Sequence, residues 1–149
     1  ARGDAEVFVA DTPGEGYGLV HRLDLNDRLA VDVPLAGLGS AVGDADLVLL
    51  ETDALGPDSA ICSVGSLTAA AVAAQLGTEV WLVAGVGRCL PAAMWEPLRA
   101  MVVSDEPWED RHEVVSLDLV DRVVGPGGPV PAAEARFRID CPVAPELIR

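Results

Sequence analysis

An uninterrupted apolar run, LVLL at residues 47–50, places the tightest constraint on what this chain can fold into. Asp46 precedes the run, and Glu51, Thr52 and Asp53 follow it, so the apolar segment is short and closed by polar residues at both ends. Such a run is typical of a strand buried on both faces, as in a parallel sheet. We therefore predict a central strand here, with a carboxylate at its carboxyl end.

A turn and a helix of small residues follow this strand. Gly56-Pro57-Asp58 are turn formers, and the residues from about Ser63 to Leu76 are mostly small or apolar. Gly77 is suited to the left-handed conformation that often ends a helix. Ligands of open α/β sheets bind beside the carboxyl ends of the strands, so this unit marks a candidate site. The helix is apolar on nearly all sides, so either the domain itself or a second subunit must cover it.

Short apolar segments alternate with helical ones along the rest of the chain. The predicted strands are Glu6–Ala10, Leu29–Val33, Glu79–Gly87 and His112–Ser116. The predicted helices are Leu19–Asp27 and Pro91–Val103, the latter interrupted by Pro97, while 35–45 forms at most a short helix and 117–124 a short helix or edge segment. This alternation predicts a Rossmann-like α/β fold, with a doubly wound and mostly parallel sheet, in a single domain over residues 1–149.

Composition excludes several classes of protein. The formal charge is −14, and all ten cationic residues are arginines, which argues against direct binding to nucleic acid. Every 18-residue window contains charges or turn formers, so we expect no membrane span. Cys62, Cys89 and Cys141 fit neither a disulfide framework nor zinc spacing, which favours a reducing cytoplasm. The arginine-only usage suggests a high-GC bacterial coding sequence.

Asp53 and Glu51 form the first candidate site. Two residues apart on an extended strand, they share one face, and two carboxylates in a crevice would raise each other's pKa. A carboxylate tuned in this way can act as a general acid or base. Alternatively, Asp53 hydrogen-bonds the following turn and Glu51 is simply solvated.

The start of the predicted helix is the second candidate, because free amide groups there attract anions. Its residues are Cys62, Ser63, Gly65 and Ser66. Either serine could instead be an ordinary N-cap, and Cys62 could be a small buried hydrophobe or a nucleophile. Since no arginine lies within this turn, we expect a site short of cations.

A glycine-rich turn at Gly14, Gly16 and Gly18, with Asp32 further on, is close to a dinucleotide fingerprint. The third glycine comes one residue early for G-x-G-x-x-G, so a plain turn remains the alternative to a nucleotide site. His21 and His112 have no acidic or cysteine partner at ligand spacing in the sequence. We therefore expect neither a metal nor a cofactor.

Three segments together resemble one known family. They are Asp46–Ala54, Gly56–Ser59 and Val64–Ser66, which match its D-x-V-L-x-G-A-D-A motif, the turn after it, and N-K-x-G-T. Thr12-Pro13 with Gly16 is similar to T-R-P-x-x-x-G, and Leu119-Val120-Asp121 to E-L-V-D. The family comprises the alpha, beta and delta subunits of translation initiation factor 2B, methylthioribose-1-phosphate isomerase and ribose-1,5-bisphosphate isomerase. The similarity covers the carboxyl-terminal half of a member, so we expect the amino-terminal helical half to be absent.

The resemblance implies roles for individual residues. Asp53 falls on the acid/base aspartate of the isomerases, while Thr12, Gly16, Glu51, Cys62, Ser63, Gly65 and Ser66 fall on ligand-binding motifs. Cys62-Ser63 replaces Asn-Lys, Glu51-Thr52 replaces Gly-Ala, and the arginine of T-R-P has no counterpart. Losing a charge-assisted contact to phosphate weakens binding by about 1.5–3 kcal/mol.

These departures predict a member that keeps the scaffold without the isomerase chemistry. We expect a cytoplasmic binding or regulatory protein that forms a homodimer or larger homo-oligomer and takes a small phosphorylated or polar ligand near Asp53. The alternatives are a divergent sugar-phosphate isomerase that uses Asp53, and a nucleotide-binding module that uses Gly14, Gly16 and Asp32.

Overall fold

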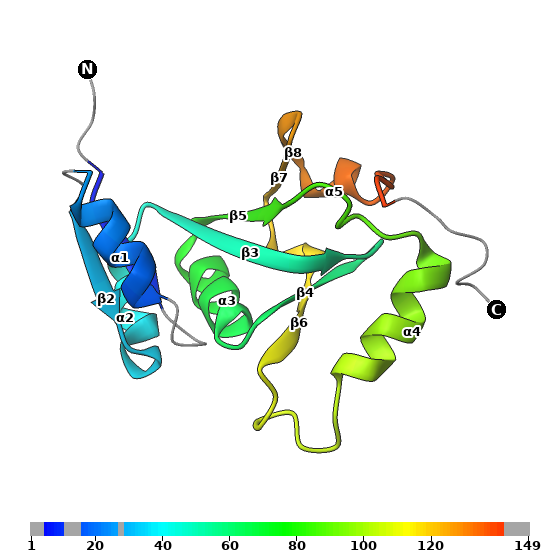
Figure 1. The fold of residues 1–149 in the computed structure, drawn as a ribbon, viewed down its shortest axis with the longest axis horizontal. Helices are drawn as coiled ribbons and strands as arrows, with labels where there is room; N and C mark the ends of the chain where they lie inside the picture. Colours follow the sequence, from blue (N-terminus) through cyan, green and yellow to red (C-terminus); the bar gives the residue numbers. More distant parts are fainter. Residues whose placement is uncertain (1–4, 11–15, 27–28, 142–149) are drawn as a thin grey trace.

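A mixed six-stranded sheet forms the body of the molecule, and a separate two-stranded sheet lies beside it (Figure 1). The computed structural model describes residues 5–10, 16–26 and 29–141. The elements in chain order are β1 Val7–Ala10, α1 Gly16–Asp24, β2 Ala30–Val33, η1 Leu35–Gly37, α2 Leu38–Asp44, β3 Leu47–Leu55, β4 Ser59–Ser63, α3 Ser66–Leu76, β5 Glu79–Ala84, α4 Ala92–Val102, β6 His112–Ser116, η2 Leu117–Leu119, β7 Arg122–Gly125, β8 Gly128–Pro131 and α5 Ala132–Ala135.

The strand order of the large sheet is β6-β4-β3-β5-β7-β8. β3 pairs in parallel with β5, and β5 with β7, whereas β4 is antiparallel to both β3 and β6, and β8 is antiparallel to β7. It follows that β3, β5, β6 and β7 run in one direction. The predicted α/β class with a mostly parallel sheet is therefore confirmed, with antiparallel strands at two places. No helix in the described part of the chain is long and apolar enough to cross a membrane.

The predicted central unit needs one correction. β3 extends to Leu55, well past the predicted end at residue 50, and the chain then returns as the antiparallel strand β4 before α3 begins at Ser66. The predicted helix start near Ser63 is therefore wrong, because Ser59–Ser63 is extended and four of its residues are buried. Gly65, at φ 95°, turns the chain into the helix, and Gly77, at φ 77°, ends it as predicted.

Two helices cover opposite faces of the sheet. Alanines of α3 pack in one core with Val48 and Leu50 of β3 and with Cys62 of β4. Ile61 belongs instead to a second cluster with Trp95 of α4, because neighbouring residues of a strand point to opposite faces. α4 covers only part of its face of the sheet. Near the start of β3 this face is uncovered, and Leu49 there is 61% exposed.

α4 also differs from its prediction. The helix runs without a break from Ala92 to Val102 and contains Pro97, which was expected to interrupt it. Its Trp95 ring lies against Gly56 in the turn between β3 and β4, where a Cβ atom would overlap the ring. Packing of the indole ring stabilises α4 on the sheet and so opposes the loss of the hydrogen bond that a proline removes, although the buried Trp95 Nε1 has no hydrogen-bond partner among the described residues.

Candidate functional site

Asp53 lies in a β-bulge of β3. Thr52 pairs with Cys62, and Ala54 pairs with Ile61, so two steps along β3 correspond to one step along β4 and Asp53 is the extra residue. Bulges redirect side chains and are common beside active sites. The Asp53 side chain is 50% exposed, whereas Thr52 and Ala54 on either side of it are buried.

Two cationic or potentially cationic side chains hold the Asp53 carboxylate. Oδ1 accepts a hydrogen bond from Arg88 Nη1 at 2.8 Å, and Oδ2 lies 3.3 Å from His112 Nε2. Arg88 Nη1 also donates to the Thr52 carbonyl at 2.9 Å, which fixes the guanidinium beside the bulge. The expectation of a site short of cations is therefore wrong for Asp53, although it was correct that no arginine lies within the turn itself.

Each partner reaches Asp53 from a different element. Arg88 follows β5 in a loop that is attached to the end of β3, where Leu55 N–H donates to the Arg88 carbonyl and Leu90 N–H donates to the Leu55 carbonyl, both at 2.8 Å. His112 is the first residue of β6, opposite Ser63 of β4. Glu51 lies two residues before Asp53 on β3, where it is exposed and pairs with Val83 of β5.

The amino end of α3 is bound by a carboxylate from the protein itself. Leu67 N–H donates to Glu113 Oε1, in a short hydrogen bond from the helix to β6. The N-cap residue is Gly65, which has no side chain to cap the helix. Neither Ser63 nor Ser66 is therefore the N-cap. An external anion at this position would compete with Glu113.

Cys62 is fully buried on the face that α3 covers. Burial raises the pKa of its thiol to about 12; the hydrogen bond with Thr52 lowers it, and the carboxylates of Glu113 and Asp53 raise it further. A thiol that stays protonated at neutral pH is a weak nucleophile. The burial of Cys62 therefore favours a role as a small hydrophobic core residue over a role as a nucleophile.

The remaining predicted site residues are less informative. Thr12 and Gly14 lie outside the described residues, and Gly16 begins α1. Asp32 is exposed on β2, opposite Val9 of β1. Among the residues that the structure describes, no cluster of three His, Cys, Asp or Glu side chains could hold a metal ion.

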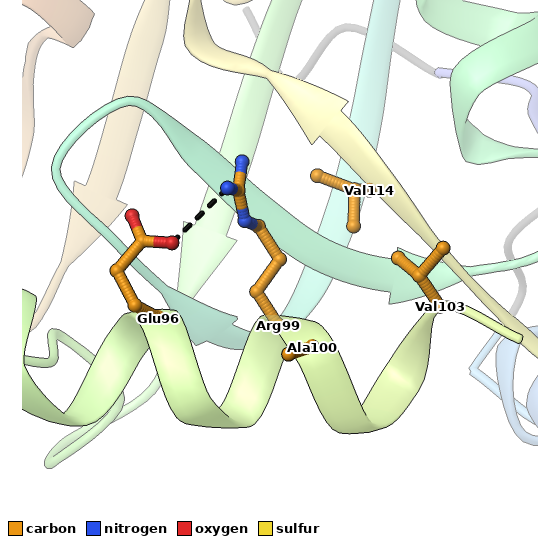
Figure 2. A pocket seen from close by; sticks show the side chains of 5 residues that line it. All are labelled: Glu96, Arg99, Ala100, Val103 and Val114. Carbon is orange, nitrogen blue, oxygen red and sulfur yellow. Dashed lines mark hydrogen bonds and ion pairs between the residues drawn. The ribbon is translucent and has the colours of Figure 1, made fainter.

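A cavity of about 350 Å³ lies away from Asp53, between α4 and β6. Figure 2 shows its lining residues: Glu96, Arg99 and Ala100 of α4 and Val103 just after the helix on one side, and Val114 of β6 on the other. Arg99 Nη2 donates to Glu96 Oε2 at 3.0 Å along the helix. Sequence patterns gave no sign of this cavity, because it depends on how α4 crosses the strands.

Comparisons with solved structures place this arrangement among known folds. The chain is similar to eIF2B beta from Chaetomium thermophilum, with a TM-score of 0.66, 18% identity, and coverage of 87% of this chain and 40% of that one. It is similar to subunit delta of translation initiation factor eIF-2B from A. fulgidus, with a TM-score of 0.69, 13% identity, and coverage of 86% and 44%. It also matches the tetrameric eIF2B-beta2-delta2 complex from C. thermophilum, with a TM-score of 0.69, 20% identity, and coverage of 88% and 43%.

The chain has the initiation factor 2B fold. The resemblance found in the sequence is thus confirmed at the level of the fold, and the chain spans less than half the length of each of these solved chains. No family model matches the sequence, and no curated protein matches it. In this initiation factor 2B fold, Asp53 lies on a central strand, at the bulge where β3 turns back toward β4.

Proposed function

We propose that this chain is a single domain that acts as a cytoplasmic, dimeric binding or regulatory protein, with a small phosphorylated or polar ligand bound at Asp53, Arg88 and His112. The observation that carries the proposal is that both oxygens of the Asp53 carboxylate already have partners, because Arg88 lies against one and His112 against the other. A general acid or base must direct its proton-carrying oxygen at the substrate. A carboxylate held by two neighbours is better suited to positioning a binding group.

The ligand class follows from Arg88. Its side chain is 36% exposed, so the guanidinium retains free N–H groups while it holds Asp53 and the Thr52 carbonyl. A planar guanidinium binds phosphate or carboxylate in a bidentate manner. We infer that an incoming anion binds Arg88, and that a ring N–H of His112 adds a second donor.

Replacement of the guanidinium tests this site. We expect Arg88→Gln to weaken the binding of ribose 5-phosphate at least tenfold, because a hydrogen bond between charged groups contributes about 1.5–3 kcal/mol. Titration calorimetry measures the Kd, and a thermal-shift series checks it independently. Arg122→Gln is the matched control, since Arg122 is also a half-exposed arginine that lies near a carboxylate, Glu79, on the same sheet. Equal binding by the wild type and both variants would contradict the proposal.

The divergent isomerase is the second candidate, and the contact between Asp53 and His112 favours it. Two half-exposed titratable groups 3.3 Å apart form a pair that could move a proton between adjacent carbons of a sugar. Turnover of ribose 1,5-bisphosphate or methylthioribose 1-phosphate that disappears in Asp53→Asn would establish it in place of the binding function.

Self-association is the remaining part of the proposal. One similar structure is described as a tetrameric complex of beta and delta subunits, and this chain leaves Leu49 exposed on its central strand. Sedimentation velocity at micromolar concentration tests it, and a monomer throughout that range would exclude a stable homodimer.

A further inference from the structure

The two edges of the six-stranded sheet are built differently. One edge is β8, where Pro129 and Pro131 pair with Val124 and Arg122 of β7. Next to them, Ala132 N–H donates to the Asp121 carbonyl at 3.0 Å. Hydrogen-bonded pairs alternate with non-hydrogen-bonded ones in an antiparallel ladder, so both prolines occupy positions whose nitrogen faces outward. This edge therefore presents no N–H donor at either position, which is a common way to prevent strand addition.

The opposite edge, β6, has no such protection. Val64 N–H donates to the Arg111 carbonyl, and Leu117 N–H donates to the Asp58 carbonyl, both at 2.9 Å, at the two ends of the β4–β6 ladder. By the same alternation, residues 111, 113, 115 and 117 direct their backbone groups toward β4. His112, Val114 and Ser116 therefore direct their N–H and carbonyl groups outward. Within the described part of the chain, β6 pairs with β4 alone.

The cavity between α4 and β6 lies beside this edge. Three of its residues, Glu96, Arg99 and Ala100, recur at the spacing that places side chains on one face of α4. Val103 directly follows the helix, and Val114 faces these residues from β6 (Figure 2). The neighbouring face of α4, with Trp95 and Leu98, is the one that packs on Ile61. Val103, which lines this cavity together with the charged pair Glu96 and Arg99, is 54% exposed. The free edge of β6 and the adjacent face of α4 thus leave room for a segment of another polypeptide.

We propose that the outer edge of β6 pairs in antiparallel fashion with β6 of a second copy, so that the sheet continues across a two-fold axis. This inference rests on the proposed self-association and names its surface. Three outward residues on each strand form three hydrogen-bonded pairs, or about six backbone hydrogen bonds. A two-fold axis normal to the sheet keeps α4 of both copies on the same side. Their cavity-lining faces then meet and fill the groove.

The sequence of β6 fits this register. With Val114 opposite its own copy, His112 lies opposite Ser116 of the partner, so no two like charges oppose each other on this face. The acidic side chain of the strand, Glu113, is on the other face and is held by the amino end of α3. A chain with a formal charge of −14 repels its copies in general, but in this register no carboxylate of β6, residues 112–116, lies opposite another carboxylate.

Proline at the centre of the edge tests the contact. Val114→Pro removes an outward N–H and leaves the bonds to β4 in place, so the fold persists and the dimer Kd rises at least tenfold. Val114→Lys, which places a charge in the groove, is the second variant and gives the same result if proline itself unfolds the strand. Val114→Thr keeps the branched side chain and the N–H, and it should associate like the wild type. Sedimentation velocity measures association, and circular dichroism measures the fold.

The outcomes separate the two proposals. A monomeric wild type contradicts both self-association and this surface. A dimer that persists in Val114→Pro and Val114→Lys contradicts the β6 surface alone. If Leu49→Lys, on the exposed face of β3, disrupts that dimer instead, the copies associate through the sheet face.

Discussion

The hydroxyl of Thr52 stabilises the bulge that carries Asp53. Oγ1 lies 2.8 Å from both the Ala54 and the Ile61 carbonyl oxygens, and the side chain is fully buried. A hydroxyl has one hydrogen, so it donates to one carbonyl at a time, but it is the polar group that both oxygens share. Removing it would leave buried acceptors without that donor.

We therefore expect Thr52→Val to destabilise the protein by about 1–3 kcal/mol, the usual effect of leaving a buried polar group unsatisfied. Valine is close in shape to threonine, so packing changes little. Urea unfolding measures the free energy difference. Thr68→Val, on an exposed position of α3, is the control and should change stability by less than about 0.5 kcal/mol. Equal stability of the two variants would contradict the role of this hydroxyl.

At the scale of elements, Glu113 connects β6 to α3. Its carboxylate accepts a hydrogen bond from Leu67 N–H in the first turn of the helix. Negative charge at this end also interacts favourably with the helix dipole, by about 0.3–1 kcal/mol at exposed sites. One side chain thus links the first turn of α3 to the neighbouring strand β6.

Two substitutions separate the charge from the hydrogen bond. Glu113→Gln keeps an acceptor oxygen and loses the charge, so a loss of about 0.3–1 kcal/mol is expected. Glu113→Ala loses both, and about 1–2 kcal/mol is expected. Hydrogen exchange in the first turn of α3 should quicken in the same order. Glu109→Gln, in the exposed loop before β6, serves as the control, and an unchanged exchange rate in Glu113→Ala would refute the cap.

The elements that sequence predicts well are those with strong local signals. Apolar runs located β1, β2, β5 and the start of β3, and Gly77 located the end of α3. β4 was missed because Ser59–Ser63 is short, rich in small residues, and followed by a helix of the same composition. Only its burial between β3 and β6 makes it a strand, and burial is a property of the assembled sheet.

The same distinction applies to the site. Arg88 follows β5, which is parallel to β3, and the carboxyl ends of parallel strands meet at one edge, so its proximity to Asp53 was open to prediction. His112 and Glu113 were not predictable in this way. They reach the site because β4 returns antiparallel and β6 adds to it, and no spacing in the sequence specifies that return.

At the scale of the whole molecule, stability depends on pH through the buried thiol of Cys62. Burial raises the pKa of this group from 9.0 to about 12. In the unfolded chain the thiol ionises near its ordinary pKa, whereas in the folded protein it keeps its proton. Its contribution to stability is therefore complete below about pH 9 and is lost progressively as the pH rises toward 12.

We expect Cys62→Ala to flatten this loss. The wild type should lose stability between pH 8 and pH 10 by more than the variant does, with a difference approaching about 1.4 kcal/mol per pH unit above pH 9. Urea unfolding of both proteins at the two pH values measures it, and every other ionising group is common to both, including Cys89, whose pKa burial also raises. The variant loses stability at every pH because of the smaller side chain, so the diagnostic quantity is the difference in slope. Parallel curves would mean that water reaches the thiol, and that α3 does not close off the face of β4 that carries Cys62.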